Sequence, residues 1–255
     1  MEKVGIICEY NPFHNGHIHH LNKIKELYPD SIIILAINGY FMQRGEISIL
    51  TKEDKVKLSL LYGIDIVIEL PTIYGTQSAD TFAYRAIESL NKLKVDAIIF
   101  GSETNDIEKL RLIAKTSLTK ENDQRIKKLL NKGLNYPTAL AKSLNIKFDF
   151  KPNDLLGISY IKAILKINSN IKPITIQRTN NYLDLDSNDE IISASNIRNK
   201  LNENIDISKS LPKESLDKII TINEYTCNIP LHTISQPIKY INDIVMKKVI
   251  VFIVL

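Results

Sequence analysis

The fold is decided by one stretch near the start of the chain, Gly5-Ile6-Ile7-Cys8-Glu9-Tyr10-Asn11-Pro12-Phe13-His14-Asn15-Gly16-His17. The apolar run Val4–Cys8 is typical of a buried β-strand, and a helical period begins at about Gly16. In open α/β sheets, ligands bind at the edge where strands hand over to helices. The motif His14-Asn15-Gly16-His17 falls at such a handover, so we expect a binding site there.

The residues of this motif suit a phosphate group. A helix N-terminus offers free N–H donors and the positive end of the helix dipole. Gly16 lacks a Cβ and would let a phosphate approach the backbone closely. His14 and His17 can point at one phosphate chain as charged or neutral donors. Chemistry at an α-phosphate needs mainly positioning and charge stabilisation, so we predict that these two histidines are catalytic.

Taken alone, a pair of histidines three residues apart does not decide between functions. His14, His17, His19 and His20 would also suit a metal site or a plain polar helix start. The rest of the sequence distinguishes these interpretations. It favours a phosphate site, with no metal ion bound by these histidines.

The first hundred residues alternate between apolar runs and segments of helical period. Continuous apolar strands are buried on both faces, so we expect a parallel sheet covered by helices, an α/β fold. The predicted strands are Val4–Cys8, Ile32–Ile37, Asp65–Leu70 and Ala97–Phe100, and the predicted helices are about Gly16–Tyr28, Lys52–Tyr62 and Ser78–Leu93.

The later sequence is less regular. From Asn105 to Asn145 it becomes rich in lysine and leucine, which indicates an inserted helical block. A further helix is expected after Pro152-Asn153, followed by an extended run at Pro173–Arg178. The pattern weakens beyond about Asn204: a helix is predicted at Pro212–Ile220, and the tail from Cys227 has no pattern that we can assign.

Composition limits the class of protein. Hydrophobic residues make up 44% and charged residues 24% of the 255, as in ordinary globular proteins, and the net charge of +4 permits an anionic partner. Cys8 and Cys227 lie outside any CxxC pair, which favours a reducing cytoplasm. The apolar end Val249–Leu255 is far shorter than the ~20 residues that span a bilayer, so no membrane anchor is expected.

A second polar turn, Ser193-Ala194-Ser195-Asn196-Ile197-Arg198, opens a predicted helix. Alone it favours an ordinary N-cap. Paired with the histidine motif, it indicates a second anion-facing terminus, where Ser195 and Arg198 would hold phosphates. The loop Gln43-Arg44-Gly45-Glu46 follows the second strand on the same edge and is either a substrate contact or a solvated turn.

Together, the histidine motif and the Ser193–Arg198 segment resemble the HIGH-type nucleotidyltransferase superfamily, whose fold is a Rossmann-like parallel sheet. The opening stretch further resembles the tRNA(Met) cytidine acetate ligases, from about Glu2 to Leu201. The other segments that resemble this family are Asn38–Glu46, Asp65–Pro71 with Tyr74-Gly75-Thr76-Gln77-Ser78-Ala79, Phe100-Gly101-Ser102-Glu103, and Pro152-Asn153-Asp154-Leu155-Leu156-Gly157.

The resemblance implies an enzyme that adenylates acetate with ATP, releases pyrophosphate, and passes the acetyl group to N4 of the wobble cytidine of elongator tRNA(Met). Mg²⁺ is expected to accompany ATP. The residues that would bind ATP are Ile7, Cys8, Glu9, Tyr10, Asn11, Pro12, Phe13, His14, Asn15, Gly16, His17, Ile18, His19, His20, Gly101, Asn153, Arg178, Ser195 and Arg198.

Two features depart from the family pattern. The segment Thr179-Asn180-Asn181-Tyr182-Leu183-Asp184 lacks the glycines and the histidine that usually follow Arg178. The chain also ends before the family's further helical domain, so we expect a truncated C-terminus that lacks part of the tRNA-binding surface. We therefore predict a nucleotidyltransferase-like ATP-binding domain over residues 1–203, with a helical insertion at about 105–150, and a partial helical region over 204–255.

Two other functions stay open on the sequence. One is a nucleotidyltransferase that acts on a small molecule, since the same phosphate motifs serve several acceptors. The other is a non-catalytic remnant that binds nucleotide or RNA through lysine-rich helices.

Overall fold

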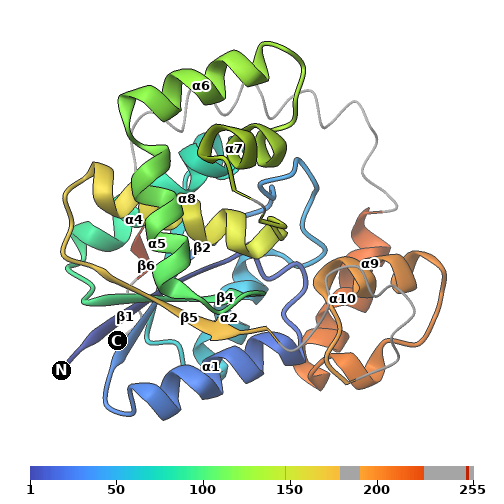
Figure 1. Cartoon of the computed structure of the whole chain (residues 1–255). Helices are drawn as coiled ribbons and strands as arrows, with labels where there is room; N and C mark the ends of the chain where they lie inside the picture. Colours follow the sequence, from blue (N-terminus) through green and yellow to red (C-terminus); the bar gives the residue numbers. More distant parts are fainter. Residues whose placement is uncertain (147, 179–189, 227–250, 253–255) are drawn as a thin grey trace.

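The computed structural model describes residues 1–146, 148–178, 190–226 and 251–252, and it has an α/β fold (Figure 1). Strands β1 to β5 are parallel and lie in the order β5-β4-β1-β2-β3, which confirms the predicted parallel sheet. A two-residue strand, β6, pairs antiparallel with β3. The strands are β1 (Lys3–Cys8), β2 (Ile32–Asn38), β3 (Ile66–Leu70), β4 (Ala97–Ser102), β5 (Lys172–Gln177) and β6 (Val251–Phe252).

The predicted helices are present; the ends of α1, α2 and α4 differ from the prediction by one residue at most, whereas the helix predicted at Pro212–Ile220 continues to Thr226. Thr51 is the N-cap of the second helix, and its hydroxyl accepts a hydrogen bond from the Asp54 N–H, as its sequence position indicates. The lysine-rich block forms three helices. The helices are α1 (Asn15–Leu27), α2 (Lys52–Leu61), α3 (Thr72–Gly75), α4 (Ala79–Lys92), α5 (Ile107–Ser117), α6 (Lys120–Leu130), α7 (Tyr136–Leu144), α8 (Pro152–Lys166), α9 (Ala194–Asn202), the 3₁₀ turn η1 (Ser208–Ser210) and α10 (Lys213–Thr226).

The sheet is buried on both faces, as its continuous apolar strands require. On one face Ile34 and Ala36 of β2 share a core with α4, α5, α7 and α8. On the other face, Ile33 and Leu35 of the same strand pack with α1, α2, α9 and α10. Figure 1 shows α5, α6 and α7 together in green, and α9 and α10 together in orange at a different part of the molecule.

The segment after Asn204 contributes to the second core. Ile207, Leu211 and Ile219 are buried in the same cluster as Val4 of β1. The boundary between a domain over 1–203 and a region over 204–255 stays a prediction. The polar stretch 179–189 and most of the tail from 227 lie outside the described residues. None of the helices in the described ranges has the length and apolar character needed to cross a membrane.

Candidate active site

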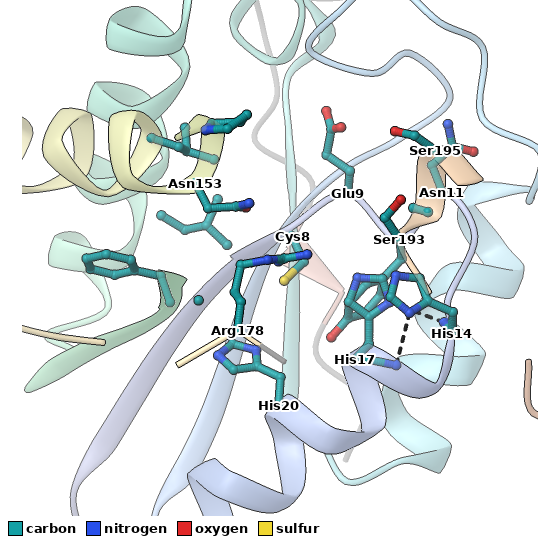
Figure 2. A pocket seen from close by; sticks show the side chains of 18 of the residues that line it. Cys8, Glu9, Asn11, His14, His17, His20, Asn153, Arg178, Ser193 and Ser195 are labelled. Carbon is teal, nitrogen blue, oxygen red and sulfur yellow. Dashed lines mark hydrogen bonds between the residues drawn. The ribbon is translucent and has the colours of Figure 1, made fainter. Parts of the chain in front are cut away.

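A cavity of about 310 Å³ opens where the carboxyl ends of β1, β4 and β5 meet the N-terminal ends of α1, α8 and α9 (Figure 2). This is the sheet edge that the strand–helix handover predicts. Residues more than 150 positions apart in sequence come together here. The predicted binding residues that line the cavity are Ile7, Cys8, Glu9, Tyr10, Asn11, His14, Gly16, His17, His19, His20, Gly101, Asn153, Arg178, Ser195 and Arg198.

Four of the predicted residues, Pro12, Phe13, Asn15 and Ile18, are absent from the lining. Phe13 is fully buried in the core behind the site. The Asn15 amide donates to the Glu190 and Lys209 carbonyls, at 3.0 and 2.8 Å, and so ties α1 to the segment around α9. Some side chains of this continuous motif point toward the pocket, and others support it from behind. The sequence alone does not show which residues belong to which group. A binding role for these four stays a prediction.

The two histidines of the motif are held by the backbone at the start of α1. His14 is the N-cap, and its Nδ1 accepts a hydrogen bond from the Gly16 N–H at 3.0 Å. His17 Nδ1 accepts from the His14 N–H at 3.2 Å, which completes a capping box. Because Nδ1 of each neutral ring is an acceptor, the ring proton lies on Nε2. Each histidine therefore has an Nε2–H available to donate to a ligand.

These histidines are neutral at physiological pH. Burial lowers the pKa of His14 from 6.5 to about 3, and the neighbouring Arg178 charge adds to this effect. Burial lowers the pKa of His17 well below its usual value, and the electrostatic effect of the neighbouring His14 is the second largest cause. His20 is affected in the same way, with its pKa lowered to about 4. The histidines are thus neutral donors, one of the two forms that the sequence left open.

Arg178 supplies the fixed positive charge. Its backbone N–H extends the pairing of β5 with β4 by donating to the Ser102 carbonyl at 3.0 Å. Its buried Nε has no hydrogen-bond partner among the described residues. A Cβ on Gly101 would lie 3.1 Å from Cγ of Arg178, so this glycine leaves room for the arginine stem. Gly101 lies inside β4, which extends two residues beyond the predicted end of the strand.

Arg198 is engaged within the protein. Its Nη1 donates to the Asn11 carbonyl at 2.7 Å, and its Nη2 forms an ion pair with Glu46 at 2.6 Å. This side chain joins three segments: the loop before α1, the loop after β2 and helix α9. Arg198 lines the pocket, but its guanidinium also fixes the shape of the pocket wall.

The loop after β2 lines the pocket through Gln43, Arg44 and Glu46. Hydrogen bonds from two neighbouring elements hold this loop in place. Glu9 Oε1 accepts from the Asn38 amide at 2.9 Å and from the Gln43 N–H at 2.6 Å. Lys55, fully buried on α2, donates to the Gly39 carbonyl at 2.8 Å, and burial lowers its pKa to about 7. The loop therefore lies at the pocket, and its role as a substrate contact stays a prediction.

Sequence reasoning missed one wall of the site. Leu156 and Tyr160 of α8 line the pocket with Phe82 and Phe100, and they continue the face of α8 that begins at Asn153. Spacing of three and four residues along that helix is the signal that could have found them. Asn153 lies in the first turn of α8, whose N-cap is Lys151. The site thus has a polar side at the histidines and a largely apolar side at α8.

Comparison with known proteins agrees with this geometry. The profile of a family described as HIGH Nucleotidyl Transferase matches residues 1–248. A tRNA(Met) cytidine acetate ligase of Fusobacterium nucleatum is 48% identical over 197 residues, covering 76% of this chain and 49% of that protein. One of Mycoplasma mobile is 41% identical over 214 residues, covering 82% of this chain and 72% of that protein.

Among solved structures, Thermotoga maritima TmcAL bound with alpha-thio ATP superposes with a TM-score of 0.76 at 35% identity, covering 88% of this chain and 56% of that one. The chain thus spans about half the length of several of its relatives. The family profile matches almost the whole chain, and the chain covers most of the Mycoplasma relative, so together they show the protein family. This chain belongs to the tRNA(Met) cytidine acetate ligase family of HIGH nucleotidyl transferases.

Proposed function

We propose that this chain binds ATP and activates acetate as acetyl-adenylate, and that the acetyl group then passes to N4 of the wobble cytidine of elongator tRNA(Met). The observation that carries the proposal is the pair of neutral histidines whose Nε2–H donors are fixed at the N-terminus of α1. Support comes from relatives that are named tRNA(Met) cytidine acetate ligase and from a relative solved with an ATP analogue.

The polar side of the pocket would hold the phosphates. The N-terminus of α1 and the Arg178 guanidinium favour an anion there. His14 and His17 would donate to oxygens of the α-phosphate, where negative charge increases in the transition state. Ser195 and Arg198, at the start of α9, would lie beside the departing pyrophosphate. Gly101 and Asn153 would contact the nucleoside on the opposite side.

In the first step, a carboxylate oxygen of acetate attacks the α-phosphorus of ATP. A phosphorus–oxygen bond to acetate forms, the bond between the α-phosphorus and the bridging oxygen breaks, and pyrophosphate leaves. In the second step, the cytidine amine attacks the acetyl carbonyl, AMP leaves and the nitrogen loses a proton. No cysteine nucleophile is needed, and burial raises the pKa of Cys8 to about 12, so its thiol stays protonated.

Mg²⁺ would accompany the nucleotide. Among the described residues, no three histidine, cysteine, aspartate or glutamate side chains are grouped so that they could hold a metal ion. Mg²⁺ in nucleotide sites is bound largely by phosphates and water with one or two carboxylates, so a full protein cage is not needed. Glu9 is a carboxylate that lines the pocket and would serve in this way. The ion would supply positive charge that offsets the negative charge of pyrophosphate.

The test is acetate-dependent exchange of pyrophosphate into ATP by the 255-residue chain, followed by the same reaction with elongator tRNA(Met). We expect exchange that requires acetate, and formation of N4-acetylcytidine with the tRNA. Exchange without acetylcytidine would keep the adenylation half of the proposal and reject acetyl transfer by this chain. Nucleotide transfer to a phosphorylated small molecule without any need for acetate would support a small-molecule nucleotidyltransferase instead.

The proposed substrates also suggest where the protein acts. Elongator tRNA serves translation, which takes place in the cytoplasm, so we place the reaction there. Fractionation of cells that produce the tagged protein, with acetylcytidine measured in the same cells, tests this location.

A further inference from the structure

Lys55 of α2 is a buried cation that takes no part in the chemistry proposed above. Its side chain is fully buried, and it is absent from the described residues that line the pocket. An ammonium group is costly to bury unless its N–H groups are bonded, and burial lowers the pKa of Lys55 to about 7. A lysine at this position therefore lowers stability unless its contacts offset the loss of water.

The Lys55 amine holds the point at which the chain leaves β2. Its Nζ donates to the Asn38 carbonyl at 3.2 Å and to the Gly39 carbonyl at 2.8 Å. Successive carbonyls of a strand point in opposite directions, so one amine reaches both only where the chain turns out of the strand. Asn38 is the last residue of β2. Lys55 therefore fixes the direction in which the following loop starts.

The loop that starts here forms a compact turn at the pocket. The Met42 N–H donates to the Glu46 carbonyl at 2.8 Å, and the Gly45 N–H donates to the Met42 carbonyl at 2.9 Å. Met42 is buried at the base of this turn, with its Sδ 3.8 Å from Lys55 Nζ. Three residues of the range 42–46 line the pocket. Lys55 thus contacts the base of a turn whose tip lies at the site.

The same junction holds a carboxylate of the pocket. The Asn38 side chain donates to Glu9 Oε1 at 2.9 Å, and the Gln43 N–H donates to that oxygen at 2.6 Å. Asn38 is therefore held through its carbonyl by Lys55 and through its amide by Glu9. The charges of Glu9 and Glu69 raise the pKa of Lys55 and oppose part of the effect of burial. A change at Lys55 would reach Glu9 as well as the loop.

We infer that Lys55 is a positioning residue for the pocket: from outside the site, its N–H donors hold the start of the loop after β2, so that residues 43–46 and the Glu9 carboxylate lie at the ligand. An amine that has lost its charge still carries two N–H donors, so both of its forms can hold the two carbonyls. The effect on catalysis rests on the proposed function, whereas the position of the loop can be measured without any ligand.

The experiment measures the loop and the reaction separately. Arg44 and Gly45 are exposed, so trypsin can cut between them once the loop opens. Lys55→Met removes the donors and keeps a side chain of similar length. Release of the fragment 1–44 should become at least about tenfold faster, as the loss of a bonded donor in a buried place predicts. Acetate-dependent pyrophosphate exchange should fall by about 10- to 100-fold, because the lining residues are displaced.

Two variants and one internal signal control for general loss of stability. Lys55→Arg keeps N–H donors at the same position and should restore slow cleavage and most of the exchange. Ser59→Ala changes another fully buried side chain of α2, whose hydroxyl donates to the Lys55 carbonyl and not to the loop, and it should alter neither measurement. Cleavage after the buried Lys162 reports global unfolding in the same digests.

The outcomes separate the inference from the function. Unchanged cleavage after Arg44 in Lys55→Met overturns the inference, and so does an equal rise in Ser59→Ala or in Lys55→Arg. Rapid cleavage with unchanged exchange also overturns it, because the loop would then move without any effect on the site. Absence of acetate-dependent exchange in the unaltered chain rejects the proposed function, while the digests still decide whether Lys55 holds the loop.

Discussion

The N-termini of α1 and α9 open onto the same pocket, yet they use their polar side chains differently. At α1, the Nδ1 atoms of His14 and His17 bond to the backbone, and an Nε2–H on each ring remains for a ligand. At α9, the Ser193 hydroxyl accepts from the Asn196 N–H, and Arg198 bonds to Asn11 and Glu46. The sequence predicts an anion site at both termini. The difference arises because the Arg198 partners come from loops far away in the sequence.

The two termini differ in the charge of the groups that would contact a ligand. The α1 terminus offers two uncharged donors in a buried place, where an excess of positive charge would be costly to maintain. The cations near it, Arg178 and Arg198, come from other elements, and only Arg178 has a buried nitrogen that lacks a partner among the described residues. We therefore expect the α1 terminus to carry the chemistry and the α9 terminus to shape the site.

The largest effect should follow from His17→Ala. Loss of one fixed donor to a developing negative charge costs about 10²–10³ in rate, so acetate-dependent pyrophosphate exchange should fall by that factor. Thermal unfolding measured on the same samples controls for loss of structure. Near-normal exchange by a folded His17→Ala protein would show that the α1 terminus does not carry the chemistry.

The neutral state of the α1 histidines predicts how stability depends on pH. The pKa of His14 and that of His20 are lowered by burial to about 3 and about 4, from 6.5 in the unfolded chain. Below pH 6.5 the unfolded chain binds more protons than the folded one, so stability is lost as the pH falls toward these values. Each such histidine should lower the free energy of unfolding by about 1 kcal/mol over a full pH unit below 6.5.

Urea unfolding at pH 7.5, 6.5 and 5.5 measures this dependence, and His20→Gln should reduce the slope because it removes one of the titrating groups. A free energy of unfolding that stays constant from pH 6.5 to 5.5 would contradict the neutral, buried state of the histidines.

The α1 terminus is also supported from behind, by α10. The buried Ser215 hydroxyl donates to the Phe13 carbonyl at 2.7 Å. Ser215→Ala should lower the free energy of unfolding by about 1–2 kcal/mol, because it leaves that carbonyl without a partner. Ser208→Ala, on an exposed hydroxyl near by in sequence, is the control and should have a smaller effect. Equal losses for the two variants would indicate that the contact contributes nothing specific.

The smallest effect tests the role of Arg198. If this side chain shapes the wall through Glu46, then Glu46→Gln and Arg198→Lys should each weaken ATP binding by less than about tenfold, as expected for a partly exposed ion pair. The double variant should be no worse than either single one. If Arg198 instead holds phosphate directly, Arg198→Lys will weaken binding while Glu46→Gln leaves it unchanged or strengthens it.

Most of the fold could be predicted because it depends on local pattern. The apolar runs of β1 to β4 and the helical spacing of α1, α2 and α4 are properties of neighbouring residues, and each lies where the pattern predicts it. The order of the strands, with β1 at the centre, follows from the rules of parallel sheets only in outline. The weak pattern after Asn204 concealed how α10 joins the second core, since its few apolar residues matter only by what they contact.

The site divides in the same way. The histidine motif, Gly101, Asn153 and Arg178 were accessible to sequence reasoning, which also identified the family. The sequence could not show that Phe13 and Asn15 support the site from behind. Nor could it show that Leu156 and Tyr160 complete one wall, because α8 presents them only after it packs against β4.

The sequence by itself determined the α/β class, the strand–helix handover at His14-Asn15-Gly16-His17 and the family of the chain, because these are written in short runs of adjacent residues. The tertiary structure alone decided the tautomers of the histidines, the partners of Arg198 and the backbone carbonyls that Lys55 binds. Each of these depends on a hydrogen bond or on burial, and neither exists until the folded backbone brings its partners together and excludes water.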